Sequence, residues 1–247
     1  MSIFGIIPAR YGSTRFPGKP LALIAGKTMI QRVYERASKA GTLSQVIVAT
    51  DDARIFKHVT DFGGQVVMTS PDHTNGTERC AEVLTLLEEV PDFVINIQGD
   101  EPLIAPAQID TLGQLLNNQQ PRIATLIQPL QDLKEVNNPN VVKAVTDESG
   151  KALYFSRYGI PYHREVGSPT PRYFKHIGIY GFAVNALREV VTWSESSLEH
   201  AERLEQLRWL EHGEAVVTAI SEHPCYAVDV PDDITLIERL LASYGEA

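Results

Sequence analysis

The 247-residue chain is poor in cysteine, has no long apolar run, and contains no acidic residue before Glu35. Its two cysteines, Cys80 and Cys225, lie far apart and outside CxxC spacing, which argues against a disulfide scaffold and favours thiols in a reducing compartment. The N-terminal apolar run is too short for a signal peptide, and no later run approaches about 18 residues. These absences predict a soluble, cytoplasmic protein.

Basic residues are outnumbered, with 22 Lys and Arg against 31 Asp and Glu, for a formal charge of −9. Nucleic acids and acidic membranes reward positive surfaces, so the sequence predicts neither as a partner. An anionic small molecule is not excluded, because a local cluster of cations can bind it. The length and the 43% hydrophobic content suit one α/β domain over residues 1–247.

Short apolar runs alternate with stretches of helical pattern, which predicts a mainly parallel sheet with helices on both faces. Shorter strands broken by a polar loop at 162–172 predict an excursion over the sheet edge at about 137–181. A long helix is expected at 196–213, with Gly213 placed to end it. The expected strands are 3–9, 45–52, 64–69, 92–102, 123–130, 141–147, 152–157, 176–182 and 225–230, and the other helices are 28–41, 53–63, 77–90 and 234–245.

Polar residues follow several of these strands directly. Arg10 follows the first strand, Asp51 and Asp52 follow the apolar part of the second, and Gln98 and Asp100 follow the apolar part of the fourth. Ligands of open α/β sheets bind at the carboxyl ends of the strands, so this edge is the expected site.

The stretch IIPARYGSTRFPGKPL, residues 6–21, carries three cations and no acid. Arg10, Arg15 and Lys19 lie with Gly12 and Gly18 in a loop between a strand and a helix, where cations and backbone N–H groups can converge on phosphate oxygens. The loop matches neither a Walker A motif nor GxGxxG. The alternative is a solvated basic turn, which the absence of a neutralising acid makes less attractive.

Two aspartates end apolar segments that are distant in the chain. Asp100 follows VINIQG and Asp229 lies in YAVDVPDD, so both could share one Mg²⁺ at the sheet edge. Singly, each is more often a turn former or a helix cap. In HTNGTER, Thr77 is expected to cap a helix, while the loop backbone and Arg79 could read the edge of a nucleobase.

Eight segments in order give the chain a resemblance to 3-deoxy-manno-octulosonate (Kdo) cytidylyltransferases that runs from Ile6 to about Leu241. The segments PARYGSTRFPGKPL and QGDEP are typical of sugar nucleotidyltransferases in general, whereas FSR, KHIGIYGF and EQLR narrow the resemblance to the Kdo enzymes. The full set is IIPARYGSTRFPGKPL, ATDD, HTNGTER, NIQGDEPLI, FSRYGIPY, KHIGIYGF, LEQLRWLEHG and YAVDVPDD.

The resemblance implies a single-domain, three-layer α/β sandwich of the nucleotide-diphospho-sugar transferase (glycosyltransferase-A-like) fold, with a mainly parallel mixed sheet. It also implies a reaction in which Kdo attacks the α-phosphorus of CTP to give CMP-Kdo and pyrophosphate, with Mg²⁺, in lipopolysaccharide synthesis of a Gram-negative bacterium. A homodimer is implied as well, with the excursion at 137–181 contributing to the sugar site and the dimer.

Carried over by position, the resemblance gives roles to individual residues. Arg10, Arg15 and Lys19 would hold the triphosphate, with Lys19 stabilising the transition state, and Asp100 and Asp229 would hold Mg²⁺. Around the nucleotide it places Ala9, Arg10, Lys19, Thr74, Gly76, Arg79 and Gln98. Around the sugar it places Ser13, Arg15, Gln98, Arg157, His176, Tyr180, Glu205 and Gln206.

Other functions remain open on the residues alone. The acceptor could be the 8-amino analogue of Kdo, and a cytidylyltransferase for sialic acid or methylerythritol phosphate is disfavoured by FSR, KHIGIYG and EQLR. A non-catalytic nucleotide-binding module is disfavoured by the joint presence of Lys19, Asp100 and Asp229. A dinucleotide-dependent dehydrogenase lacks GxGxxG after the first strand.

Overall fold

A nine-stranded mixed sheet forms the centre of the computed structural model, which describes residues 1–12, 15–165 and 170–245. The strand order is β11-β7-β10-β6-β1-β4-β5, and β8 and β9 extend from β10. Strand β10 is antiparallel to both β6 and β7, whereas the other pairs along the main path are parallel. The strands are β1 (Ile3–Ala9), β4 (Gln45–Thr50), β5 (Gln65–Met68), β6 (Phe93–Asn96), β7 (Ile123–Pro129), β8 (Lys143–Thr146), β9 (Ala152–Ser156), β10 (Phe174–Ala183) and β11 (Val216–Ile220).

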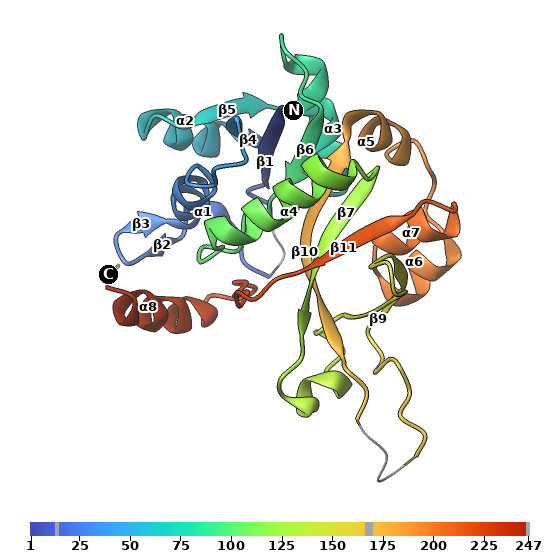
Figure 1. The fold of residues 1–247 in the computed structure, drawn as a ribbon. Helices are drawn as coiled ribbons and strands as arrows, with labels where there is room; N and C mark the ends of the chain where they lie inside the picture. Colours follow the sequence, from blue (N-terminus) through green and yellow to red (C-terminus); the bar gives the residue numbers. More distant parts are fainter. Residues whose placement is uncertain (13–14, 166–169, 246–247) are drawn as a thin grey trace.

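Helices cover both faces of this sheet (Figure 1). Strand β1 shows why, because Ile3 and Ile7 point to one buried face while Phe4 and Ile6 point to the other. The first face packs against α1 (Met29–Ala37), α2 (Ala53–Asp61) and α4 (Pro106–Gln119). The second packs against α3 (Gly76–Leu86), α5 (Val184–Val190) and α7 (Gln206–Glu211), with α6 (Ser197–Glu202) beside α7. The predicted three-layer sandwich with a mainly parallel mixed sheet is confirmed.

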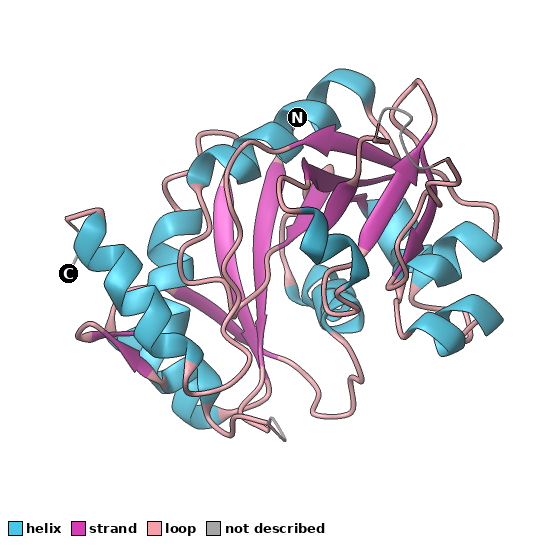
Figure 2. Ribbon diagram, turned by 90° about the horizontal axis from the view of Figure 1, so that it is seen from below, coloured by secondary structure: helices cyan, strands magenta, loops and turns pink. Residues whose placement is uncertain are grey.

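A smaller layer lies beside the first face, where α8 (Asp233–Ser243) packs against the hairpin of β2 (Leu23–Ile24) and β3 (Lys27–Thr28) (Figure 2). Val228 is fully buried in this cluster with Leu103 and Ile237. The segment that enters α8 is therefore held against the carboxyl end of β6.

The excursion departs from the sheet through the 3-10 helix η2 (Leu133–Asn137), β8, β9 and the first part of β10 (Figure 1). The fully buried Lys143 holds the start of the excursion together. Its ammonium donates hydrogen bonds to the carbonyl oxygens of Asn138, Val141 and Arg157. Burial lowers the pKa of Lys143 below its ordinary value. Residues 166–169 of the polar loop at 162–172 lie outside the described residues.

The single helix expected at 196–213 is wrong, since the structure has two short helices there. Arg203 ends α6 in the left-handed region with φ 54°, and α7 begins at Gln206. The break lets Leu204 and Leu207 both enter the second face of the core. Burial of these two side chains therefore outweighs the helical periodicity of the sequence.

The strand expected at 225–230 is also wrong. This segment has no regular pairing, and the backbone N–H of Val228 instead donates to the carbonyl oxygen of Asp100 at 2.9 Å. The edge position next to β7 is taken by β11, which the sequence pattern did not reveal. The segment is therefore free to cross the end of β6 and bring Asp229 there.

Candidate active site

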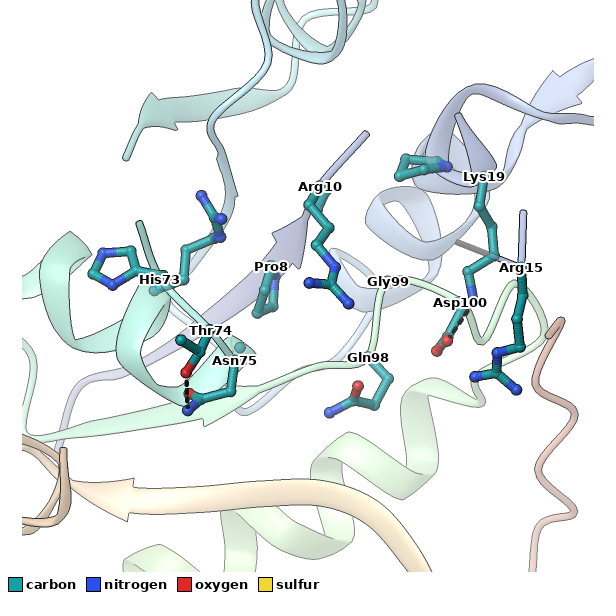
Figure 3. Close-up of a pocket in the computed structure, with 14 residues that line it drawn as sticks. Pro8, Arg10, Arg15, Lys19, His73, Thr74, Asn75, Gln98, Gly99 and Asp100 are labelled. Atoms are coloured by element: carbon teal, nitrogen blue, oxygen red, sulfur yellow. Dashed lines mark hydrogen bonds and ion pairs between the residues drawn. The ribbon is translucent and has the colours of Figure 1, made fainter. Parts of the chain in front are cut away.

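A cavity of about 270 Å³ opens at the carboxyl ends of β1 and β6, where the sequence predicted the site (Figure 3). Lys19 and Arg15 lie at one end of it, Thr74 and Asn75 lie at the other, and Arg10 lies between them. Its walls are Pro8, Ala9, Arg10, Arg15, Lys19, Pro20, His73, Thr74, Asn75, Gly76, Arg79, Gln98, Gly99 and Asp100.

The basic loop after β1 is anchored at its two ends. Gly18 has φ 73°, which disfavours other residues, and its N–H donates to the carbonyl oxygen of Tyr11 at 2.9 Å. A Cβ on Gly18 would come within 3.1 Å of three atoms of the Tyr11 side chain. Tyr11 also packs against the core of the first face and against Arg54, whose guanidinium lies 3.3 Å from the ring centroid while it binds Asp52. Packing thus fixes the entry to Lys19.

Two of the three cations of this loop are paired with acids from distant segments. Lys19 Nζ lies 2.7 Å from Asp100 Oδ2, and an Arg15 nitrogen lies 3.0 Å from Asp229 Oδ1. Although the sequence around Lys19 and Arg15 contains no acid, the fold brings an acid from a distant segment to each of them. The Arg15–Asp229 pair is more than half exposed, so it contributes little stability.

Gly99 lets β6 and β1 end close together. A Cβ on Gly99 would lie 2.8 Å from the carbonyl oxygen of Pro8, closer than such atoms approach. Gly99 thus keeps the backbone before Asp100 close to the end of β1.

The other end of the cavity is a loop that leads into α3. Asn75 caps this helix, because its side chain accepts a hydrogen bond from the Glu78 N–H, so the expected cap at Thr77 is wrong. Burial would raise the pKa of Glu78, but hydrogen bonds from Thr74 and Asn75 outweigh it and hold that pKa below its ordinary value. The carboxylate therefore stays ionised and fixes the loop backbone.

Arg79 lies beneath this loop and is almost fully buried. Its guanidinium donates to the hydroxyl of Thr69 and to the carboxylate of Asp51. These partners orient the side chain at the cavity wall and link the carboxyl ends of β4 and β5 to α3.

Two polar side chains lie on the second face of the sheet beneath the cavity, Asn96 at the end of β6 and Gln98 just after it. Gln98 Nε2 donates to the carbonyl oxygen of Gly178 at 2.9 Å. Asn96 is 3% exposed, and its Oδ1 accepts no hydrogen bond from any described residue. Sequence reasoning missed Asn96, although an amide within the apolar run VINI was a usable signal.

His176 and Tyr180, assigned to the sugar by the resemblance, belong to an aromatic cluster on this face. The His176 ring lies 5.0 Å from Phe155 and 5.3 Å from Tyr180, while Trp209 lies 4.9 Å from Tyr180. Burial lowers the pKa of His176 to about 3, so the ring is neutral and bonds to Thr125. Burial also raises the pKa of Tyr180.

Glu205 and Gln206 begin α7 beside this cluster rather than lying on an exposed helix face. Burial raises the pKa of Glu205 to about 7, against a hydrogen bond from the Thr77 hydroxyl that lowers it. Gln206 is 4% exposed, and its Nε2 has no hydrogen-bond partner among the described residues. Both side chains thus present buried polar atoms near α3.

Arg157 has protein partners of its own. Its guanidinium donates to the carbonyl oxygens of Glu202, Pro139 and Arg203. Ser13, also assigned to the sugar, lies outside the described residues.

Metal ligands are sparse in the protein as described. No group of three or more His, Cys, Asp and Glu side chains there could hold a metal ion by itself. Asp100 pairs with Lys19 and Asp229 pairs with Arg15, and the Val228–Asp100 hydrogen bond brings the two carboxylate segments together. Mg²⁺ is usually held by one or two carboxylates together with substrate phosphates, so this donor pair fits it. No helix in the described ranges is long and apolar enough to cross a membrane.

Comparison with known proteins identifies the family. A family model described as cytidylyltransferase matches residues 4–216. The 3-deoxy-manno-octulosonate cytidylyltransferase of Syntrophobacter fumaroxidans is 47% identical over 98% of each chain. The chain belongs to the 3-deoxy-manno-octulosonate cytidylyltransferases. The enzyme of that name from Vibrio cholerae is also 47% identical, over all of both chains.

Solved structures agree with this family assignment. A structure of CMP:2-keto-3-deoxy-manno-octonic acid synthetase complexed with CTP has a TM-score of 0.93 at 41% identity, covering 99% of this chain and 100% of the other. A 4-diphosphocytidyl-2C-methyl-D-erythritol synthase from Anaerococcus prevotii has a TM-score of 0.66 at 14% identity, over 98% of each chain. The second likeness shows the shared fold alone.

Proposed function

We propose that the protein transfers a cytidylyl group from CTP to Kdo, giving CMP-Kdo and pyrophosphate. The observation that carries this is the convergence of Arg10, Arg15 and Lys19 with Asp100 on one cavity at the sheet edge, in a chain of this family. A hydroxyl oxygen of Kdo forms a bond to the α-phosphorus, the bond from that phosphorus to the β-phosphate breaks, and the hydroxyl loses its proton. Pyrophosphate leaves with the electron pair.

Phosphoryl transfer of this kind needs positioning and charge neutralisation more than covalent help. Arg10 and Lys19 reach the cavity from a loop whose ends are fixed by packing, so their cationic groups need little rearrangement to hold phosphate oxygens. We assign Lys19 to the charge that develops around the transferring phosphorus, because its side chain is much less exposed than that of Arg15.

Mg²⁺ is the cofactor that the donor set supports, with Asp100 and Asp229 as its protein ligands. Bound there, it would neutralise phosphate charge and lower the pKa of the attacking hydroxyl. Lys19 and Arg15, which hold these carboxylates in the free protein, would then be available to the phosphates.

The cytidine is assigned to the end of the cavity formed by Ala9, Thr74, Gly76 and Arg79, with Gln98 at its floor. Gly76 fits this role because a Cβ there would already press on Pro8, at 3.2 Å from its ring. The hydrogen bonds of Asn75 and Glu78 fix the loop, so its backbone groups are preorganised to read the edge of a base.

The sugar is assigned to the polar groups on the second face of the sheet. Glu205 is hydrogen-bonded to Thr77 of α3, and the next residue, Gln206, has a side-chain N–H to donate. Neutral sugar hydroxyls suit such buried polar groups. The other members of this proposed sugar site are Arg15, Gln98, Arg157, His176 and Tyr180.

A homodimer, a cytoplasmic location and a role in lipopolysaccharide synthesis complete the proposal. The excursion supports the dimer, because it carries exposed apolar and aromatic side chains, among them Leu153, Tyr158 and Tyr162. Elution of the protein at twice its 27.4 kDa mass is expected. The substitution Tyr162→Glu should shift it to the monomer.

A pyrophosphate-release assay with CTP, Mg²⁺ and a panel of acceptors tests the reaction. We expect turnover with Kdo, with its 8-amino analogue as the competing acceptor and sialic acid as a negative control. Failure to use either octulosonate would refute the proposal. Binding of CTP without turnover of any acceptor would favour a non-catalytic module.

A further inference from the structure

Asn96 is a buried amide whose side-chain oxygen has no hydrogen-bond partner in the described protein. It ends β6, is 3% exposed, and its Oδ1 accepts no hydrogen bond from the described residues. A buried polar atom without a partner destabilises a fold by about 1–3 kcal/mol, so such atoms are rare away from functional sites. Another buried amide, Gln108, shows the usual situation, with its Oε1 bonded to Ala105 and its Nε2 to His223.

The position of Asn96 relates it to both parts of the proposed site. A Cβ built on Gly76, which lines the cavity, would lie 3.6 Å from Asn96 Nδ2. In the sheet, Asn96 pairs directly with Tyr180 of β10 and with Ile6 of β1. Its amide is therefore beneath the start of α3, on the face that also holds the aromatic cluster.

A second unpartnered amide on this face has the opposite polarity. Gln206 Nε2 is a donor without an acceptor, and its neighbour Glu205 is bonded to Thr77, which follows Gly76. A ligand with both donor and acceptor atoms, such as a polyhydroxylated acid sugar, would satisfy the two amides together. The aromatic rings between the strands and α7 supply apolar surface but few donors.

We infer that Asn96 is a specificity-determining residue whose Oδ1 accepts a hydrogen bond from a hydroxyl of the bound sugar. This inference rests on the proposed function and adds a residue to its sugar site. A site built around an unpaired acceptor discriminates strongly against an analogue that lacks the matching hydroxyl. Asn96 thereby contributes to the choice between octulosonates and other acidic sugars.

The test compares Asn96→Leu, which has a similar volume and no polar atom, with the natural protein. We expect the KM for Kdo to rise about threefold to tenfold, as one net hydrogen bond predicts, while the KM for CTP stays the same. One deoxy analogue of Kdo, lacking the contacted hydroxyl, should lose affinity for the natural protein but not for Asn96→Leu. The Asn96→Ala variant repeats the measurement if the leucine does not fold.

Thermal unfolding of the free protein separates ligand binding from a structural role. Loss of an unpartnered amide should leave the Tm of Asn96→Leu unchanged or higher, whereas Gln108→Leu, which removes a partnered amide, should lower it. An unchanged KM for Kdo, or a rise confined to CTP, would overturn the inference. Kdo turnover by the natural protein tests the proposed function separately, so failure of one is distinguishable from failure of the other.

Discussion

Lys19 Nζ lies 2.7 Å from Asp100 Oδ2 and 2.7 Å from the carbonyl oxygen of Val228. One ammonium thus joins the end of β6 to the segment that carries Asp229. The same residue that we assign to the transferring phosphate also holds together, in the free protein, the two segments whose carboxylates fit a metal.

Replacing Lys19 with alanine should lower turnover by about 100-fold or more, because a preorganised cation at the transferring phosphate is lost. The loss also leaves Asp100 and the Val228 carbonyl without this donor, so we expect a fall in stability of about 1–3 kcal/mol. Steady-state kinetics and a melting curve measure both. Lys57→Ala removes an exposed ion pair on α2 and should change neither. Full activity in Lys19→Ala would contradict the assignment.

Chelation of divalent cations should abolish turnover, and Asp100→Asn should raise the Mg²⁺ concentration needed for half activity by at least about tenfold. A readout without catalysis is the melting temperature in the presence of CTP, titrated with Mg²⁺. The natural protein should gain stability as Mg²⁺ rises, and Asp100→Asn should gain less. Asp110→Asn, at a carboxylate that binds Thr42 far from the cations, is the control. Identical titrations for Asp100→Asn and the natural protein would exclude Asp100 as a ligand.

Arg157→Ala should raise the KM for Kdo, as proposed for a residue of the sugar site, and should also lower the Tm. The second effect follows from the three main-chain carbonyl oxygens that its guanidinium binds, and we expect about 1–3 kcal/mol, or a few degrees. Arg157→Lys keeps the positive charge but loses the several N–H donors of the guanidinium. Compared with Arg157→Ala, it should therefore restore most of the affinity for Kdo but little of the Tm. If Kdo binding is unchanged in a folded Arg157→Ala protein, the residue is structural only.

Glu205 should make the free protein less stable as pH rises from about 4.5 to 7. Burial raises its pKa from the ordinary 4.5 to about 7, so the folded state retains a proton that the unfolded state releases in this window. Glu205→Gln cannot ionise, and its stability should fall less over the same range. Urea unfolding at several pH values measures the difference. Parallel curves for the two proteins would show that the carboxyl is not buried as described.

His176 should act in the opposite direction at lower pH. Burial lowers its pKa from 6.5 to about 3, so the unfolded state takes up a proton that the folded state does not, and stability falls as pH drops through this interval. His176→Phe should therefore resist acid better than the natural protein. Equal losses of stability in the two proteins between about pH 6.5 and 4 would contradict the lowered pKa of His176.

Most strands and the edge that holds the site could be predicted, because short apolar runs ending in polar residues identify the carboxyl ends of a parallel sheet. Arg10, Gln98 and Asp100 line one cavity as that rule requires. The pairing of Lys19 with Asp100 was not foreseen, because it depends on how β1 and β6 lie side by side.

The errors lie where tertiary contacts outweigh local pattern. The helix expected at 196–213 breaks at Arg203 so that buried leucines can turn inward, and the run at 225–230 gives its hydrogen bond to the end of β6 instead of to a neighbouring strand. Thr77 has the residue type of a helix cap, but Asn75 takes that position and leaves the Thr77 hydroxyl for Glu205. The sequence therefore predicted correctly that the Thr77 hydroxyl makes a hydrogen bond, but its partner is Glu205 and not the helix backbone.

The two ion pairs at the phosphate end of the cavity cancel the charges of Lys19 and Arg15 in the free protein, so these two side chains attract anions only weakly. A bare anion such as inorganic phosphate has to displace Asp100 from Lys19, or Asp229 from Arg15, and leaves a carboxylate without its cation. If Asp100 and Asp229 bind Mg²⁺ as proposed, a polyphosphate that carries its own divalent cation would leave neither carboxylate unmatched, because Lys19 and Arg15 would be available to the phosphates. On the proposed function, the two pairs would make the site selective for a ligand whose charge is already compensated, and nucleotide and metal would each strengthen the binding of the other.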